Sequence, residues 1–217
     1  MKKSWILFFG ILFLGIFLRF WELGKIPEGF YSDEALYGYE AYSLYKTGRD
    51  QFGHLWPLSI AGFGDYRPAL YIYATIPFVA ALGLNEIAVR LPSAFSSAAT
   101  LVFTFLIVRR LFRKSSLALI AMLLLAVSPW HVFFGRMSHE TNFVTLLITG
   151  GIFFLLRGRT CKPCLLMSLF WFGAAIYTYH SARVFVPLFF LLTAVLLRFD
   201  IKKNLGLVIF AALLFGL

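Results

Sequence analysis

The chain has 217 residues, of which 60% are hydrophobic and only 14% are charged. This composition excludes an ordinary soluble domain, in which about a quarter of the residues are charged. The formal net charge of +10 does not indicate nucleic-acid binding, because basic residues beside apolar segments are what membrane topology requires. We therefore interpret the chain as an integral membrane protein in contact with membrane lipids and without a nucleic-acid partner.

Seven apolar segments are candidates for transmembrane helices, which need about 20 mostly apolar residues each. They predict an all-α fold: a polytopic membrane helical bundle of about seven transmembrane helices, plus in-plane interfacial helices in the first outer loop. The last segment is too short to cross about 30 Å of hydrocarbon at about 1.5 Å per residue. We therefore expect residues 1–217 to be the N-terminal part of a longer transmembrane domain. The predicted spans are Ser4–Trp21, Leu91–Val108, Ser115–Phe134, Asn142–Leu156, Leu165–Tyr179, Val184–Leu197 and Leu205–Leu217.

The apolar segment Ala69–Leu84 is ambiguous, because it is short for a span and contains Pro77. If it lies in the outer membrane surface and the N-terminus is cytoplasmic, the inner segments hold 12 of the 20 basic residues and one acid, Asp200. If it spans, every later loop changes side and most basic residues move outside. Only the first arrangement obeys the positive-inside rule. We therefore predict an in-plane or re-entrant outer helix.

The first outer loop, residues 22–90, contains the stretch GFYSDEALYGYEAYSLYKTGRD with two adjacent carboxylates, Asp33 and Glu34. Ser32 is a suitable N-cap, and the two acids would lie in the first turn, where the helix dipole favours negative charge. Thr47 with the following glycine is a plausible stop. The tyrosines between these ends predict an amphipathic helix in the membrane interface. In the plainest interpretation, the acidic pair only caps this helix.

Further carboxylates and arginines are predicted to gather at the same membrane face. Arginine suits phosphate, whereas carboxylates suit proton abstraction or a divalent metal. The pattern therefore favours a site over simple helix capping. The candidates are Asp65 and Arg67 in FGDYRPALYIY, Arg90 in NEIAVRLPSA, and Arg136, His139 and Glu140 in SPWHVFFGRMSHETNF.

In this order, the motifs SDEALYGYEAYSLYKTGRD, FGDYRPALYIY, NEIAVRLPSA and SPWHVFFGR resemble the membrane glycosyltransferases of the GT-C superfamily. The branch that includes protein O-mannosyltransferases and aminoarabinose transferases is the most similar. The resemblance implies a multi-pass plasma-membrane enzyme with a cytoplasmic N-terminus and an active site on the outer face. Such an enzyme moves a sugar, usually with inversion, from a polyprenyl-phosphate donor to a protein, lipid or glycan acceptor.

The resemblance also implies roles for particular residues. Asp33 is the expected general base, and Glu34 is expected to support it or to bind a metal. Arg67 and Arg90 are expected near the donor phosphate, and we group Arg136 with them. The family often has Lys-Pro-Pro where this chain has Arg-Pro-Ala, so the charge is kept but the backbone differs. The resemblance fixes no cofactor, and a divalent metal stays open, with Asp65, His139 and Glu140 as candidate metal or acceptor residues.

Two other interpretations compete with an enzyme. A transporter or lipid flippase would show paired repeats and charges near the middle of the membrane, whereas this chain shows no repeat and has its charges at span ends. The chain is alternatively a non-catalytic part of a longer protein. The enzyme interpretation predicts that Asp33 borders one cavity, because a ligand pocket is only about 10 Å across. This cavity should also contain Arg67, Arg90 and at least one of Arg136, His139 and Glu140.

Several remaining polar residues are interpreted without a site. Cys161 and Cys164 form a CxxC in a predicted inner loop, where disulfides are disfavoured, and no second pair completes a zinc site. Arg19 is predicted to extend to lipid headgroups. His54 and His180 are interpreted as interfacial polar residues.

Overall fold

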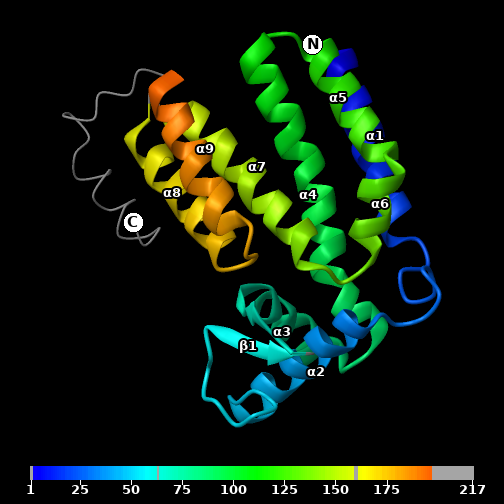
Figure 1. The fold of residues 1–217 in the computed structure, drawn as a ribbon. Coiled ribbons are helices and arrows are strands. Elements are labelled where there is room, and N and C mark those ends of the chain that lie inside the picture. The colour runs from blue at the N-terminus through cyan, green and yellow to red at the C-terminus, as the bar shows by residue number, and fades with distance from the viewer. Residues whose placement is uncertain (1, 63, 159–160, 197–217) are drawn as a thin grey trace.

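The computed structural model describes residues 2–62, 64–158 and 161–196. These residues form a bundle of apolar helices with a smaller lobe at one end (Figure 1). The bundle contains α1 (Lys2–Phe20), α4 (Glu86–Phe112), α5 (Ser115–Val127), α6 (Pro129–Arg136), α7 (Glu140–Gly158), α8 (Lys162–Ile176) and α9 (Ala182–Leu196). The lobe contains α2 (Ser32–Thr47), β1 (Ser59–Gly62), β2 (Asp65–Pro68) and α3 (Leu70–Leu82).

The number of membrane spans differs from the prediction. Within the described ranges, α1, α4 and α7 are long and apolar enough to cross a membrane, and α5 with α6 makes a fourth if the bent pair counts as one span. The predicted span Ser115–Phe134 is therefore broken, with a bend of 58° between its two helices. Helices α8 and α9 have 15 residues each, about 22 Å, which is less than the hydrocarbon thickness. Seven spans are thus not confirmed, and Leu205–Leu217 lies outside the described residues.

The break between α5 and α6 is filled by Arg19, from the last turn of α1. The end of a helix leaves carbonyl groups without helical partners, and Arg19 donates to two of them, Leu125 O at 3.3 Å and Ala126 O at 3.1 Å. Its Nε also donates to Ser97 Oγ on α4 at 2.5 Å. The prediction that Arg19 extends to headgroups is wrong, because the side chain is fully buried. It joins three helices instead.

Helix α2 ends as the sequence predicts but begins differently. After Thr47, Gly48 adopts φ +68° and its N–H bonds the preceding turn, which is the left-handed cap that glycine favours. Ser32 is the first helical residue and not the cap. The Tyr31 N–H instead donates to the carboxylate of Glu34 at 3.2 Å. Glu34 therefore closes the start of its own helix, like the acid of a capping box.

The segment Ala69–Leu84, predicted to lie in the membrane plane, forms the 13-residue helix α3. Its length of about 20 Å is too short for a span. Figure 1 shows α3 close to end-on, so it crosses the direction of the long helices. Beside it, β1 and β2 form an antiparallel hairpin in which Ile60 pairs with Arg67. The orientation of α3 in a membrane stays a prediction.

The start of α4 also differs from the prediction. The sequence predicts a span that begins at Leu91 with Pro92 in its first turn. The helix begins at Glu86, because the side chain of Asn85 accepts the Ala88 N–H at 2.9 Å and caps it. Pro92 therefore lies inside the helix, where it removes one backbone hydrogen bond.

The two cysteines also differ from the expectation that the sequence gives. The structure joins Cys161 and Cys164 by a disulfide at the start of α8, with their Cα atoms 5.3 Å apart. This spacing lies within the range that a disulfide needs. The structure thus contains a disulfide where the sequence disfavours one, while a role for the motif stays untested.

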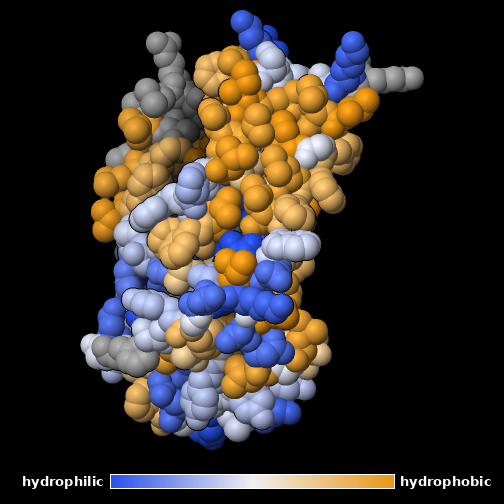
Figure 2. Space-filling model, turned by 90° about the vertical axis from the view of Figure 1, so that its right-hand side faces the viewer, coloured by the Kyte–Doolittle hydropathy of each residue, from blue (hydrophilic) through white to orange (hydrophobic). Residues whose placement is uncertain are grey.

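The surface of the molecule separates into an apolar and a polar part. On the face in Figure 2, hydrophobic residues cover the bundle and hydrophilic residues dominate the lobe. Ile6, Phe9 and Phe13 of α1 are among the exposed apolar side chains. The N-terminus and the turn between α4 and α5 lie at the end of the bundle opposite the lobe (Figure 1). The predicted inner and outer ends are thus separated, while which end faces the cytoplasm stays a prediction.

Candidate functional site

An accessible ion pair lies on the lobe, between the start of α2 and strand β2. Asp33 is in the first turn of α2, and its Oδ1 is 2.9 Å from Nη2 of Arg67 on β2. The two side chains are 16% and 18% exposed, so a ligand can approach both. The structure thus brings together the expected base and one expected phosphate-binding cation.

Tyr37 extends this pair toward the bundle. Its hydroxyl accepts a hydrogen bond from Nη1 of Arg67 at 2.8 Å and donates to Glu140 in the first turn of α7. Burial raises the pKa of Tyr37, and the charge of Glu140 raises it further, so the phenol stays protonated. The sequence analysis does not single out Tyr37. Its position in the sequence could have pointed to it, because a residue four positions after Asp33 lies on the same face of a helix.

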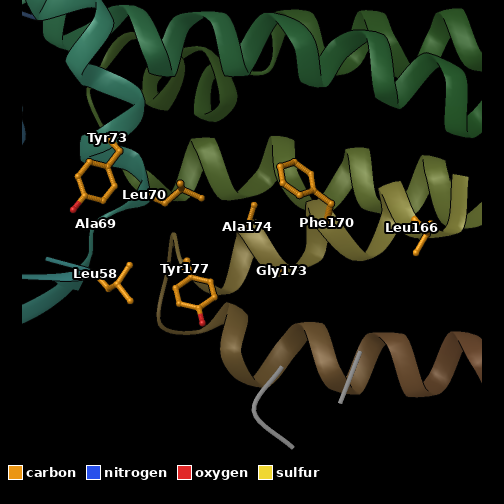
Figure 3. Close-up of a pocket in the computed structure, with 9 residues that line it drawn as sticks. All are labelled: Leu58, Ala69, Leu70, Tyr73, Leu166, Phe170, Gly173, Ala174 and Tyr177. Atoms are coloured by element: carbon orange, nitrogen blue, oxygen red, sulfur yellow. The ribbon is translucent and has the colours of Figure 1, made fainter. Parts of the chain in front are cut away.

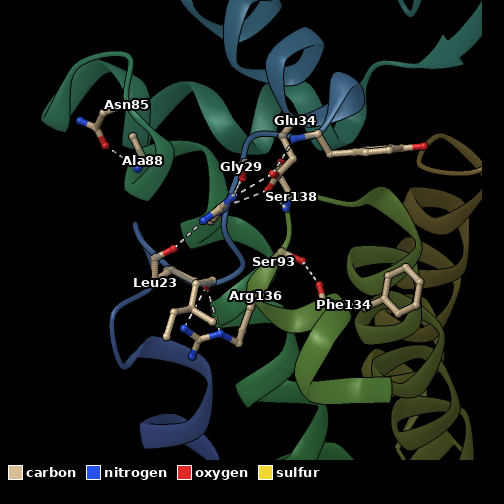
Figure 4. A network of polar contacts seen from close by, with 12 residues as sticks. Leu23, Gly29, Glu34, Asn85, Ala88, Ser93, Phe134, Arg136 and Ser138 are labelled. Carbon is tan, nitrogen blue, oxygen red and sulfur yellow. Dashed lines mark hydrogen bonds and ion pairs between the residues drawn. The ribbon is translucent and has the colours of Figure 1, made fainter. Parts of the chain in front are cut away.

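The second carboxylate has a different environment. Glu34 is fully buried and forms a two-pronged ion pair with Arg90 of α4, with Nε to Oε1 at 3.0 Å and Nη2 to Oε2 at 3.1 Å. Oε1 also accepts the Ser138 N–H at 2.7 Å. Figure 4 shows Ser138, from the α6–α7 connection, beside Glu34. Glu34 therefore fastens the start of α2 to the bundle.

The other two candidate arginines bind the protein backbone. Nη1 of Arg90 donates to Leu23 O at 3.0 Å and Nη2 to Gly29 O at 2.7 Å, and the side chain is fully buried. The guanidinium of Arg136 donates to carbonyl oxygens of the same loop, including Ile26 O at 2.9 Å, and Arg136 is 8% exposed. Figure 4 shows Arg136 reaching into this loop. Both arginines hold the segment that leads into α2.

The remaining candidates are divided between two places. Glu140 joins the Asp33 network through Tyr37, and its Oε2 is 3.5 Å from Nδ1 of His139. Asp65 is exposed at the hairpin turn, where its Oδ1 accepts the N–H of the next residue at 2.7 Å. Within residues 2–62, 64–158 and 161–196, no group of three or more His, Cys, Asp or Glu side chains could hold a metal. A metal at these residues stays a prediction.

An apolar cavity of about 550 Å³ opens beside the Arg67 strand, between α3 and α8 (Figure 3). Its wall includes Ala69, which follows Arg67 by two positions. The Leu70 N–H donates to Tyr177 O at 3.3 Å, which connects the start of α3 to the end of α8. The residues that line the cavity are Leu58, Ala69, Leu70, Tyr73, Leu166, Phe170, Gly173, Ala174 and Tyr177.

The hairpin that carries Arg67 is held by the turn between α8 and α9. Nε2 of His180 lies 2.5 Å from Tyr66 O, one residue before Arg67. The sequence analysis assigns His180 only to the membrane interface. Its contact with β2 shows that a residue remote in sequence supports the strand on which the accessible arginine lies.

Comparison with known families decides the class of the chain. Residues 67–217 match the family described as dolichyl-phosphate-mannose-protein mannosyltransferase. The chain belongs to this family. The resemblance to GT-C membrane glycosyltransferases is thereby confirmed, and the enzyme interpretation is favoured over a transporter. No curated protein and no solved structure matches the chain.

The family match does not cover the acidic pair. It begins at Arg67, so Asp33 and Glu34 precede the matched residues. The catalytic role of the acidic pair therefore rests on its geometry and on the motifs of the sequence.

Proposed function

We propose that this membrane glycosyltransferase moves a sugar from a polyprenyl-phosphate donor to an acceptor hydroxyl at the outer face of the cell membrane. The family's description points to mannose as the sugar and to a protein as the acceptor. The observation that carries the proposal is the accessible Asp33–Arg67 pair at 2.9 Å. It sets a proton acceptor beside a cation, which are the two groups that this transfer needs.

Asp33 acts as the general base in this reaction. Its carboxylate removes the proton of the acceptor hydroxyl while that oxygen attacks the anomeric carbon of the sugar. The bond between this carbon and the phosphate oxygen breaks, and polyprenyl phosphate leaves with the bonding electrons. Attack from the opposite side inverts the anomeric centre. The first turn of α2 favours the ionised carboxylate, because the helix dipole stabilises negative charge there.

Arg67 stabilises the leaving phosphate. Among contacts with described residues, Asp33 and Tyr37 engage two of its five N–H groups. Burial alone would lower the pKa of Arg67, but the hydrogen bond to Asp33 and the contact with Tyr37 outweigh it and raise the pKa. The group is therefore a permanent cation placed where negative charge develops. Arg90 and Arg136, whose guanidinium groups bind the protein, are assigned to positioning.

The apolar cavity between α3 and α8 supplies a place for the isoprenoid tail. A tail needs an apolar wall that starts close to the phosphate site. Ala69 and Leu70 provide this start, because they follow Arg67 by two and three positions along the chain. A volume of about 550 Å³ lies within the range of ligand pockets and accommodates the first part of a long chain.

Transfer of labelled sugar tests the proposal. Membranes that contain the full-length protein are incubated with labelled polyprenyl-phosphate mannose, and label in protein is measured. Arg67→Gln should lower kcat/KM for the donor by about tenfold or more, because a charged hydrogen bond contributes about 1.5–3 kcal/mol. Arg49→Gln is the matched control, since Arg49 is an exposed arginine of the same lobe.

Two results would contradict this proposal. One is an absence of transfer by the wild-type protein from any polyprenyl-phosphate sugar. The other is an equal kcat/KM in the Arg67 and Arg49 variants.

A further inference from the structure

A second cavity, of about 320 Å³, lies between α6 and the first turns of α7. We call it the imidazole cavity, because two of the four histidines of the chain line it. Its volume is at the lower end of the range for ligand pockets. The lining residues are Trp130, His131, Phe134, His139, Thr141, Asn142 and Thr145.

The lining combines aromatic rings with neutral polar groups. Trp130 and Phe134 supply rings with centroids 4.9 Å apart, and the other residues supply imidazole, hydroxyl and amide groups. No Lys, Arg, Asp or Glu is among the lining residues. A phosphate would therefore lack a cation in the cavity wall. A neutral molecule with an apolar face and several hydroxyl groups fits this chemistry better.

His139 presents a hydrogen-bond donor in this cavity. Its Nδ1 accepts the backbone N–H of Thr141 at 3.2 Å, and a backbone N–H can only donate. In the neutral ring, the proton therefore lies on Nε2. No described residue accepts a hydrogen bond from that atom, so it is available to an oxygen that enters the cavity.

His131 supplies a second imidazole ring to the cavity wall. Its Nδ1 lies 2.7 Å from Nη2 of Arg19, and arginine can only donate. The ring proton of His131 is therefore also on Nε2, which is buried and has no hydrogen-bond partner among the described residues. A buried atom is out of reach of a molecule in the cavity, so the cavity's hydrogen-bond donor is His139.

We propose that the imidazole cavity binds a sugar ring. The apolar C–H face of the ring lies against Trp130 and Phe134, while the Nε2–H group of His139 donates to a hydroxyl oxygen of the sugar. The cavity adjoins the site described above, because His139 precedes Glu140, and Glu140 accepts the hydrogen bond of Tyr37. This inference rests on the proposed function for the origin of the sugar, which is either the lipid donor or a glycan on the acceptor.

Binding of methyl mannoside to the full-length protein in lipid nanodiscs tests the cavity directly. Saturation-transfer NMR detects such weak binding and requires no turnover. Trp130→Leu should weaken binding by about two- to tenfold, from the loss of an aromatic contact of about 0.5–1.5 kcal/mol. Trp130 is 74% exposed, so its replacement should not disturb folding. Trp21→Leu is the matched control, since Trp21 is 58% exposed and does not line the cavity.

A second variant tests the hydrogen-bond donor of His139. His139→Phe keeps a ring of similar shape and removes the N–H, so it should weaken mannoside binding as well. His139 also accepts the Thr141 N–H at the start of α7, and thermal unfolding therefore has to accompany the measurement. Loss of binding in a variant that unfolds at the wild-type temperature supports the sugar site. No saturation transfer to the wild-type protein, or equal loss in the Trp130 and Trp21 variants, would overturn it.

The origin of the sugar is resolved with two lipids, polyprenyl phosphate and polyprenyl-phosphate mannose. If Trp130→Leu weakens binding of the mannosylated lipid alone, the cavity holds the sugar of the donor. If the Trp130→Leu variant binds both lipids as the wild-type protein does, while its binding of methyl mannoside falls, the sugar belongs to the acceptor. Mannoside binding without any transfer activity would reject the proposed function and retain the sugar site.

Discussion

Two carboxylates adjacent in sequence have opposite environments in this protein. Asp33 pairs with Arg67 of the hairpin, and both side chains are partly exposed. Glu34 pairs with Arg90 of α4, and both side chains are fully buried. The same local motif thus makes one ion pair that a ligand can reach and one that it cannot. Sequence adjacency therefore does not imply a shared role.

Helix geometry explains the difference. Consecutive residues of an α-helix point about 100° apart, so the first turn of α2 directs one carboxylate toward the hairpin and the other toward α4. Burial of a charge is costly unless hydrogen bonds satisfy it. Glu34 meets this requirement with Arg90 and with the N–H groups of Tyr31 and Ser138. Asp33 keeps contact with solvent.

The largest effect is expected for Asp33→Asn. The amide has nearly the shape of the carboxylate but cannot act as a base, so transfer of labelled sugar should fall by about a hundredfold to ten-thousandfold. The thermal unfolding temperature should change little, because the side chain is partly exposed. Glu28→Gln is the control for the change of carboxylate to amide, since Glu28 is an exposed acid of the same loop. Near-normal transfer by the Asp33→Asn variant would leave Asp33 only a capping role.

Glu34→Gln should show the reverse pattern. The buried pair with Arg90 loses its charge on one side, so the unfolding temperature should fall. The activity of the fraction that remains folded should fall less than in the Asp33 variant. Measurement of both quantities on both proteins separates catalysis from support, and equal patterns would remove the distinction between the two pairs.

Arg90→Met should destabilise the protein by about 3–5 kcal/mol, the range for removal of one partner from a buried ion pair. The carboxylate of Glu34 would stay buried without its cation. Thermal unfolding in detergent measures the effect, with Arg49→Met as the exposed control. Simultaneous Glu34→Leu should recover part of the loss, because it removes the unpaired charge. An unfolding temperature equal to that of the control would contradict the buried pair.

The smallest effect concerns another buried acid of the lobe. Oε1 of Glu40 is buried without a hydrogen-bond partner among the described residues, and burial raises the pKa of this carboxyl. The folded state therefore holds the proton more tightly, and stability falls as pH rises from about 4.3 through the folded pKa. Glu40→Gln should stabilise the protein at neutral pH by on the order of 1 kcal/mol. The gain should vanish at acid pH, and a gain that is independent of pH would contradict this explanation.

Prediction from the sequence succeeds where a feature depends on nearby residues. The end of α2 at Thr47 follows from the glycine after it, and the short helix after Pro68 follows from the length of its apolar segment. Prediction fails where partners come from other elements. Arg19 is buried because the end of α5 and Ser97 of α4 meet it, and Tyr37 enters the site because α7 brings Glu140 to its hydroxyl.

The sequence by itself determined the membrane class, the helical composition and the glycosyltransferase resemblance, because apolar length, charge placement and motif order are local properties of the chain. Only the tertiary structure decided which arginine serves which carboxylate. Arg67, Arg90 and Arg136 are chemically alike in the sequence, and each could contact a phosphate. Packing distinguishes them. Arg90 binds the buried carboxylate of Glu34 and backbone carbonyl groups, and Arg136 binds backbone carbonyl groups. Arg67 remains partly exposed beside Asp33.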